Sequence, residues 1–569
     1  MKFIRFVLGK KTDMKNFTKT IEGNIVDIAG RCITPGRIII EDGRIASITA
    51  DSSLSGEALP YILPGFIDSH IHIESTLMIP ENYARLAVKN GIVAAVCDPH
   101  EIANVLGMEG VDYMIENGKK VRFNFHYTAP SCVPSTPFET AGAALGPQEI
   151  VLLIGREDIV GLAEMMNVPG VVYADKDVMA KINATHDAGK PVDGHAPKIS
   201  GDMLKKYVEA GISTDHECET CEEAIEKITL GVKILIREGS AARDFESLYP
   251  LIEEHPGMAM FCSDDMYPDD AETIGYINGM VRRSIEKGMP LWETLECACT
   301  TPVKHYGLKN GILQQGDSAD FIVVGDMKDF EIRSTYIQGH EVYNAETGIS
   351  ASLTKNTAPA TNEVPNNFNA KEIDAASLRI EWQDRMLKVI TATEGSLITG
   401  KELIKAEADD NGNIKTATEK GIAKLVVYDR YNGGKPQAAY IKGFNIHRGA
   451  IASTIAHDCH NIIAVGCSDE EIATAINRLV QERGGLAACD GSKVECLPLP
   501  VAGLMSLYNL EETAEMHTKI RAMAKEMGCS ISAPFMTLAF MALPVIPELK
   551  LTDKGLFDGN KFEFTSLWE

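Results

Sequence analysis

The sequence contains no segment typical of a membrane-spanning or exported chain. Its strongly apolar stretch SAPFMTLAFMALPVIP has only residues 535–543 between two prolines, whereas a spanning helix needs roughly 20 residues. The N-terminal stretch MKFIRFVLGKKTDMKNF is basic, but it has no apolar run of the length found in signal peptides. We therefore expect a cytoplasmic protein in which residues 535–543 form a buried core segment.

Positive charge is scarce in the chain. There are 55 Lys and Arg against 80 Asp and Glu, which gives a formal net charge of −25. This charge argues against binding nucleic acid or an anionic membrane through bulk electrostatics. It is compatible with a neutral or cationic small molecule as the substrate.

A disulfide framework is also absent. The 13 cysteines are scattered and odd in number, and without an export signal we expect them to be reduced. Cys218 and Cys221 form one C-x-x-C, but no second pair follows at the spacing of a zinc ribbon. We expect these two residues to be ordinary thiols.

Two distant parts of the chain share short β-like runs. NIVDIAG and RIIIEDGRIASI lie near the N-terminus, and Asp42-Gly43 is a hairpin-turn signal between two β-branched runs. Similar runs return in GILQQGDSADFIVVGD and IRSTYIQGHEVYN. We predict one small β-sandwich domain built from residues 1–62 and 310–350, with another domain inserted into it.

Strand-like and helix-like segments alternate between these two parts. The strand candidates are GFIDSHIH, VAAVCD, VRFNFHY, GLAEM, PVDGHAP, ISTDHE, VKILIREG and AMFCSDD. Such alternation predicts parallel strands with right-handed crossovers, and its length is typical of a (β/α)₈ barrel. We predict a TIM-like barrel over residues 63–309, and an open doubly wound sheet is the alternative.

The rest of the chain predicts a third domain of the α/β class. Residues 351–374 are polar and contain proline, as in a linker. From residue 375 to 569, AKLVVYDRYNGGKPQAAYIKGF indicates two strands joined by a loop. NIIAVGCSDEEIATAINRLVQERGG indicates a strand and then a helix, with Ser468 and Glu471 forming a capping box.

Two histidines interrupt the apolar run of the first barrel strand. His70 and His72 are two residues apart in GFIDSHIH, so in a strand they lie on one face. Two imidazoles at this spacing can hold a metal ion, although a pair of hydrogen-bonded polar residues is the plainer interpretation. Asp68 shares their face, where it can orient one histidine through its second nitrogen or serve as a hydrogen-bonded core carboxylate.

Further ligand-type side chains stand at the carboxyl ends of later strand candidates. Glu164 lies in IVGLAEMMN, His195 in PVDGHAP, His216 in ISTDHE and Asp264 in AMFCSDD. Barrel enzymes carry their chemistry at these strand ends. Each residue alone would more often be structural, but their shared placement favours a metal-dependent hydrolase.

The same segments resemble a known family. PGFIDSHIHIE, the later histidines and SDD resemble the amidohydrolase superfamily of metal-dependent barrels. The segments PGFIDSHIHIEST, VCDPHEIANVLG, GLAEMMN, DGHAP, FCSDD and IASTIAHDCHNIIAVG resemble the adenine deaminase family within it. The similarity runs over nearly the full length in family order. It implies a metal-dependent barrel fold and adenine as the substrate.

The resemblance also implies a binuclear metal site. It puts His70, His72, Glu164 and Asp264 on one divalent ion, and Glu164, His195 and His216 on a second. Many relatives bridge two ions with a carbamylated lysine, but no lysine stands in the matching strand, and Lys176 falls in a helical context. Glu164 fits as the bridge. The resemblance favours Mn²⁺ or Fe²⁺, and the donor set also suits Zn²⁺.

The implied reaction is hydrolysis of adenine to hypoxanthine and ammonia. A metal lowers the pKa of bound water, and the resulting hydroxide would attack C6 while Asp264 carries the proton to the ring or to the leaving amine. One alternative is a ring-opening amidohydrolase of the dihydropyrimidinase type, against which the missing lysine counts. The other is a non-catalytic barrel, against which the complete set of ligand-type residues counts.

Four more residues are candidates for the same site. His100 and Glu101 follow Asp98 in DPHEIANVLG and can contact the purine edge or aid proton transfer, although this segment also looks like an acidic helix start. Glu217, next to His216, is a second catalytic candidate. His126 in NFHYTAPSCVPS is a weaker candidate for orienting the substrate.

His457 and His460 in IAHDCHN are three residues apart, so on a helix they would share a face. They can cover the barrel mouth, bind another ion, or be a satisfied structural pair. By analogy with other barrels of this size we expect a homodimer. Adenine and water are the partners that the resemblance implies.

Overall fold

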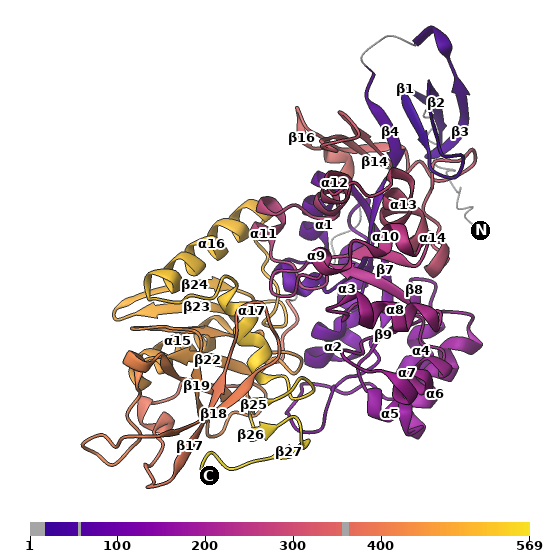
Figure 1. Ribbon diagram of the computed structural model, residues 1–569. Coiled ribbons are helices and arrows are strands. Elements are labelled where there is room, and N and C mark those ends of the chain that lie inside the picture. Colours follow the sequence, from indigo (N-terminus) through magenta and orange to yellow (C-terminus); the bar gives the residue numbers. More distant parts are fainter. Residues whose placement is uncertain (1–17, 55–58, 356–363) are drawn as a thin grey trace, which may run out of the picture.

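The computed structural model describes residues 18–54, 59–355 and 364–569. It contains a small β-sheet, a (β/α)₈ barrel and a C-terminal α/β region, which Figure 1 shows at the top, at the right and at the lower left. The basic N-terminal stretch lies outside the described residues, as does part of the expected linker. Within the described residues, none of the helices has the length and hydropathy needed to cross a bilayer.

The small sheet is built from both flanks of the barrel. Its eight strands run in the order β16-β15-β14-β13-β4-β1-β2-β3. Strand β4 joins the two flanks because it pairs with β1 on one side and β13 on the other. Asp42 and Gly43 form the predicted hairpin turn with φ of 48° and 81°. The strands are β1 Thr18–Asp27, β2 Cys32–Glu41, β3 Arg44–Ala50, β4 Tyr61–Pro64, β13 Phe321–Val324, β14 Ile332–Ile337, β15 His340–Asn344 and β16 Gly348–Ile349.

Parallel strands form the barrel. Strands β5 to β9 pair in sequence order, and so do β10 to β12. Two parallel bridges, Ile71 with Asp264 and Val192 with Ile212, join these sheets and close the ring. The strands are β5 Phe66–Ile71, β6 Ile92–Cys97, β7 Asn124–Ala129, β8 Ile159–Met165, β9 Val192–Gly194, β10 Thr214–Asp215, β11 Lys233–Arg237 and β12 Ala259–Cys262.

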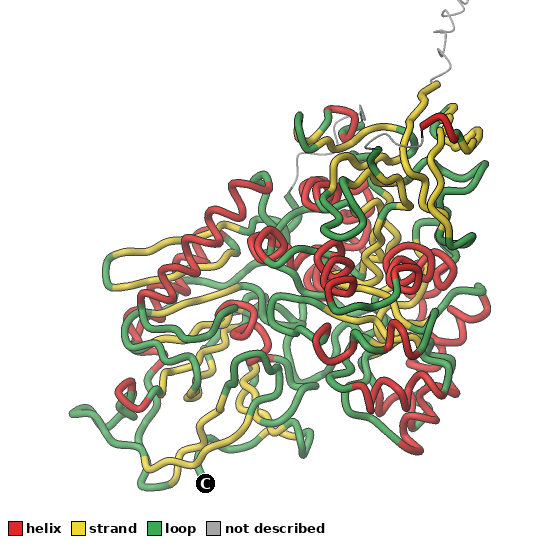
Figure 2. The backbone as a smooth tube through the Cα atoms, turned by 45° about the horizontal axis from the view of Figure 1, so that its top comes forward, coloured by secondary structure: helices red, strands yellow, loops and turns green. Residues whose placement is uncertain are grey.

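Helices surround these strands, as the red coils around the yellow strands show in Figure 2. The helices lie between successive strands in the sequence. Because the two bridges close the ring of strands, the prediction of a closed barrel is correct and the alternative of an open sheet is wrong. The helices are α1 Pro80–Lys89, α2 His100–Leu106, α3 Met108–Gly118, α4 Pro147–Ile154, α5 Val168–Val172, α6 Lys176–Asp187, α7 Gly201–Glu209, α8 Cys221–Thr229, α9 Phe245–Leu248, α10 Leu251–Glu254, α11 Pro268–Thr273, α12 Ile277–Glu286, α13 Leu291–Leu295 and α14 Thr301–Tyr306, with the π-helical segment η3 Glu296–Thr300 before the last.

The C-terminal region has an eight-stranded sheet with helices on both faces. The strand order is β18-β17-β20-β19-β22-β21-β23-β24. Helix α15 packs on one face through residues such as Ile472 and Leu479, and α16 and α17 pack on the other. The strands are β17 Met386–Thr391, β18 Gly400–Lys405, β19 Ile422–Tyr428, β20 Gln437–Lys442, β21 Ala450–Ser453, β22 Ile462–Gly466, β23 Gly485–Asp490 and β24 Lys493–Pro498.

The helices of this region are α15 Asp469–Glu482, α16 Leu510–Glu526 and α17 Pro534–Ala539, and a small sheet follows in β25 Leu549–Thr552, β26 Gly555–Asp558 and β27 Glu563–Phe564. Ser468 caps α15 by accepting the backbone N–H of Glu471, but the Glu471 carboxylate accepts the Ser468 hydroxyl and not its backbone N–H, so only half of the predicted capping box forms. The stretch 535–543 is buried, as predicted, in α17 and the turn that follows it.

Part of the expected linker belongs to the C-terminal core. Phe368 and Ala370 are buried against the α15 face of the sheet, and the apolar side chain of Ile373 packs against the same cluster. The polar composition that suggested a linker therefore describes only some of residues 351–374. The residue boundaries given above for the domains stay predictions.

The packing of α15 gives a stability prediction. Leu479 is fully buried under this helix, so Leu479→Ala should lower the free energy of unfolding by about 2–5 kcal/mol through lost burial and the cavity left behind. The exposed control Thr474→Ala on the same helix should change it by less than about 0.5 kcal/mol. Chemical denaturation measures both, and equal effects of the two variants would contradict this packing.

Candidate metal centre

His70 and His72 extend from the end of β5 into a buried cluster. The Nε2 atom of His72 lies 3.2 Å from Oδ1 of Asp264 and 3.3 Å from Oε1 of Glu164. Nε2 of His70 lies 3.4 Å from the same Asp264 oxygen and has no hydrogen-bond partner. Asp264 follows β12 with a φ of 57°, and its backbone bonds to the backbone of both histidines.

Glu164, at the end of β8, lies between two sets of imidazoles. Its Oε1 faces His72, while its Oε2 lies 2.7 Å from Nδ1 of His195 and 3.1 Å from Nε2 of His216. The ring of His216 also stacks on that of His70 with centroids 4.3 Å apart. The structure thus brings together the six residues that the sequence analysis put on metal ions.

The donor set of this cluster fits divalent cations. Burial alone would raise the pKa of Glu164, but the charges of His195 and His216 outweigh it and hold that pKa well below its usual range. The nitrogen atoms face carboxylate oxygens, and at least one, Nε2 of His70, has no hydrogen-bond partner. Imidazole and carboxylate ligands suit Mn²⁺, Fe²⁺ and Zn²⁺.

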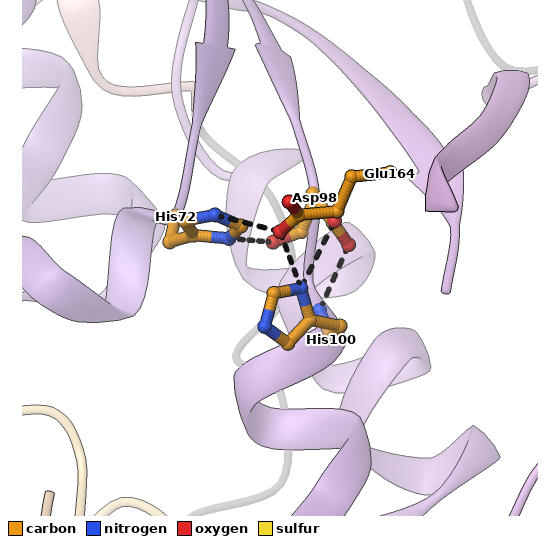
Figure 3. A group of neighbouring side chains, drawn as sticks. All are labelled: His72, Asp98, His100 and Glu164. Atoms are coloured by element: carbon orange, nitrogen blue, oxygen red, sulfur yellow. Dashed lines mark hydrogen bonds and ion pairs between the residues drawn. The ribbon is translucent and has the colours of Figure 1, made fainter. Parts of the chain in front are cut away.

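Asp98 orients two histidines of the cluster, as Figure 3 shows with His72, His100 and Glu164. Its backbone carbonyl lies 3.1 Å from Nδ1 of His72, which leaves Nε2 of that ring to face the cluster. Its carboxylate lies 2.9 Å from Nδ1 of His100 and also accepts the backbone N–H of His100. His100 is therefore held beside Glu164, 3.4 Å from Oε1.

Asp68 does not orient a histidine ring. Its carboxylate accepts hydrogen bonds from the hydroxyls of Ser263, at 2.5 Å, and Tyr276, at 2.6 Å. Burial raises its pKa to about 6. Of the two interpretations left open by the sequence, the hydrogen-bonded core carboxylate is the one that the structure supports.

Arg237 is a member of the site that sequence reasoning missed. It ends β11 and is 3% exposed. Its Nη1 atom bonds Oε1 of Glu217 and lies 3.0 Å from Oδ2 of Asp264, and its Nε atom bonds Asp244 at 2.9 Å. The available signal was one basic residue at the carboxyl end of the apolar strand KILIR.

Two histidines of the C-terminal region reach Glu101. Nδ1 of His457 lies 2.7 Å from Oε1 of Glu101, and Nε2 of His460 contacts Oε2. Burial disfavours a charged His457, but the charge of Glu101 outweighs it and raises the pKa to about 9. Burial lowers the pKa of His460 to about 4. The pair lies in a turn between β21 and β22 and not on a helix.

The C-terminal region also supplies walls of the cavity over the cluster. Leu397, Asp458, Phe540 and Leu543 line it together with the cluster residues. A neighbouring cavity of about 650 Å³ shares His195, Glu217 and Arg237 with the cluster and extends between the barrel and residues 395–398 and 545–547. The site therefore lies between two parts of the chain that are distant in sequence.

One other sequence-based candidate, His126, lies elsewhere. His126 is near the start of β7, where its Nε2 bonds Asn310 at 2.6 Å beside the small β-sheet. The structure does not bring it to the cluster, because the catalytic end of a barrel strand is its carboxyl end. Lys176, which the sequence analysis set aside because of its helical context, is exposed at the start of α6.

Comparison with known sequences identifies the family. The pattern of the amidohydrolase family matches residues 61–342, and that of the adenine deaminase C-terminal domain matches residues 396–563. The chain is 47% identical to an adenine deaminase of Methanosarcina acetivorans over 96% of this chain and 99% of that protein. It is 48% identical to an adenine deaminase of Sulfurovum sp. NBC37-1 over 96% and 98%.

The chain belongs to the adenine deaminase family.

Among solved structures, a β-aspartyl dipeptidase of Fervidobacterium islandicum AW-1 is 17% identical, with a TM-score of 0.44 over 60% of this chain and 100% of that one. The family match covers both the barrel with its cluster and the C-terminal region that lines the cavity. The four residues of the C-terminal region that line the cavity over the cluster all lie within the matched C-terminal domain, namely Leu397, Asp458, Phe540 and Leu543.

Arg237 gives a testable prediction. Arg237→Met would leave the buried carboxylates of Glu217, Asp244 and Asp264 without their cation, so the free energy of unfolding should fall by about 3–5 kcal/mol. The exposed Arg243→Met, which removes contacts to two backbone carbonyls, should cost about 1 kcal/mol or less. Chemical denaturation compares the two. A loss for Arg237→Met no larger than for Arg243→Met would contradict the assigned network.

Lys550 gives a prediction on pH. Its buried ammonium bonds the carbonyls of Leu397 and Phe540 at 2.9 Å, and burial lowers its pKa from 10.5 to about 7. Between about pH 7 and pH 10.5 the Lys550 side chain is protonated in the unfolded chain but largely neutral in the folded protein. The free energy of unfolding that this group contributes therefore rises with pH in this window. The unfolding free energy of the wild type minus that of Lys550→Met should increase from pH 6.5 to 10 in denaturation experiments, and a flat difference would refute the shift.

Proposed function

We propose that this chain hydrolyses adenine to hypoxanthine and ammonia as part of purine salvage in the cytoplasm. The main support is the 47% identity to an adenine deaminase over 96% of the chain. The cluster that such a hydrolysis needs is complete, since all six ligand-type residues converge. We expect the protein to act as a homodimer.

Two divalent ions would be held by this cluster. His70, His72, Glu164 and Asp264 would bind one ion, and Glu164, His195 and His216 the other, with Mn²⁺ or Fe²⁺ preferred. The two oxygens of Glu164 face different histidines, which supports a bridging role. When bound, the cations supply the positive charge that makes water a nucleophile near neutral pH.

Asp264 is the proposed proton carrier. It would accept a proton as water adds to C6 of adenine, and return it to the ring or to the leaving amine. The C6–N bond then breaks, ammonia leaves and hypoxanthine remains. Arg237 holds Oδ2 of Asp264 at 3.0 Å, which leaves Oδ1 directed at the histidines.

Glu217 would assist Asp264, because it lies 3.4 Å from Nε2 of His216 and shares Arg237. His100 and Glu101 would contact the purine or aid proton transfer. Their carboxylate and imidazole groups line the same cavity. We leave His126 out of the proposed site because of its position at the start of β7.

A ring-opening amidohydrolase is a weaker candidate. Its metal centre would be expected to contain the bridging lysine that this cluster replaces with Glu164. The match of residues 396–563 to the adenine deaminase C-terminal domain also favours the deaminase. Ultraviolet absorbance with adenine and with a dihydropyrimidine, on protein loaded with Mn²⁺, separates the two.

Asp264→Asn tests the assignment. We expect turnover of adenine to fall by about 10²- to 10⁴-fold, with the far-ultraviolet circular dichroism of the wild type retained. Asp202→Asn is a matched control, since that side chain is 95% exposed on α7, and it should keep full activity. Full activity of Asp264→Asn would remove Asp264 from the mechanism. No turnover of adenine by the wild type would refute the function.

A further inference from the structure

Resting on this proposed function, we propose that Asp458 binds the imidazole N–H of adenine and selects the free base against purines substituted on that ring. Asp458 belongs to the turn between β21 and β22 of the C-terminal region. It lines the cavity over the cluster together with His100, Glu101 and Glu164.

An unpaired acceptor marks Asp458. The residue is 3% exposed, and its Oδ2 atom is buried with no hydrogen-bond partner. A buried acceptor without a partner costs about 1–3 kcal/mol, and more when it is charged. A ligand that brings an N–H into the cavity would remove this cost.

The neighbouring acid, Glu101, also has a buried oxygen without a hydrogen bond, Oε2, but that oxygen lies in an ion pair with His460. One of its oxygens contacts His457 and the other His460, and His100 lies 3.4 Å away. Its carboxylate is thus already surrounded by imidazoles. Asp458 therefore has an acceptor oxygen that is not paired with any of these imidazole rings.

Adenine has two kinds of N–H group. The amine at C6 must lie at the metal cluster for deamination, so the imidazole N–H is the donor left for a second contact. In a nucleoside or a methylated base this donor is replaced by carbon. When a substituted purine binds, a carboxylate directed at this position stays buried without a hydrogen-bond donor. When adenine binds, the carboxylate accepts the ring N–H, so adenine is preferred.

The remaining walls suit a flat aromatic ring. Phe540 stacks on His457 with ring centroids 4.3 Å apart, and Leu397 and Leu543 line the same cavity. These side chains give the purine an apolar surface, while Asp458 supplies a polar contact. Recognition of the base would thus come from the C-terminal region and the chemistry from the barrel.

The experiment uses adenine, 9-methyladenine and 7-methyladenine with the full-length, metal-loaded protein. Both methylated bases lack the ring N–H but carry the methyl group on opposite sides of the ring, which separates a lost hydrogen bond from a clash. The wild type should favour adenine in kcat/KM over both by at least about 10- to 150-fold, the value of a hydrogen bond to a charged group. Comparable turnover of all three bases by the wild type would overturn the proposal without any variant.

Asp458→Ala and Asp458→Asn test the residue itself. For adenine, kcat/KM should fall by about 10- to 150-fold, mainly through KM, as for a lost hydrogen bond to a charged group. For the methylated bases it should change by less than about threefold, so the preference shrinks. A merely structural role would reduce all three substrates alike, and that result would overturn the proposal.

Glu139→Gln is the matched control. Glu139 is a buried acid, 5% exposed, whose pKa is raised well above its usual range by burial and by the charge of Asp458, but it does not line the cavity. The Glu139→Gln variant should keep the preference for adenine.

Metal content is measured on every variant. A loss of metal in the Asp458 variants would overturn the proposal, because Asp458 would then be a metal ligand. An inactive wild type would instead count against the proposed function.

Discussion

The site depends on a buried carboxylate placed between imidazoles. Glu164 directs one oxygen at His72 and the other at His195 and His216, in a place from which water is largely excluded. A carboxylate there is costly unless positive charge compensates it. Parallel strands closing into a ring bring the ligand-type side chains to one end without any long loop, and divalent cations would supply the missing charge.

The carboxylates around the cluster are also compensated by nearby positive charges. Arg237 offsets Glu217 and Asp264, and a protonated His457 offsets Glu101. The second of these pairs crosses from the barrel to the C-terminal region, so the two parts share one electrostatic network. This explains how a domain that holds none of the proposed metal ligands can still shape the reaction, by closing the cavity and fixing its polar groups.

The sequence was informative where local rules decide the outcome. The i and i+2 spacing of His70 and His72, and the rule that barrel chemistry lies at carboxyl strand ends, predicted that these side chains would converge, and they do. Long-range contacts carry no such local signal. Arg237 looked like the end of an apolar strand, the spacing of His457 and His460 did not reveal their turn or their contact with Glu101, and His126 stood on a barrel strand but near its wrong end. Each of these positions is set by packing between segments far apart in the chain.

Diffraction from crystals grown with Mn²⁺, measured for anomalous signal, tests the central claim most directly. The account predicts two strong anomalous peaks, one on each side of the Glu164 carboxylate, with His70 and His72 nearest one peak and His195 and His216 nearest the other. A single peak, or peaks away from Glu164, would contradict a centre bridged by this residue.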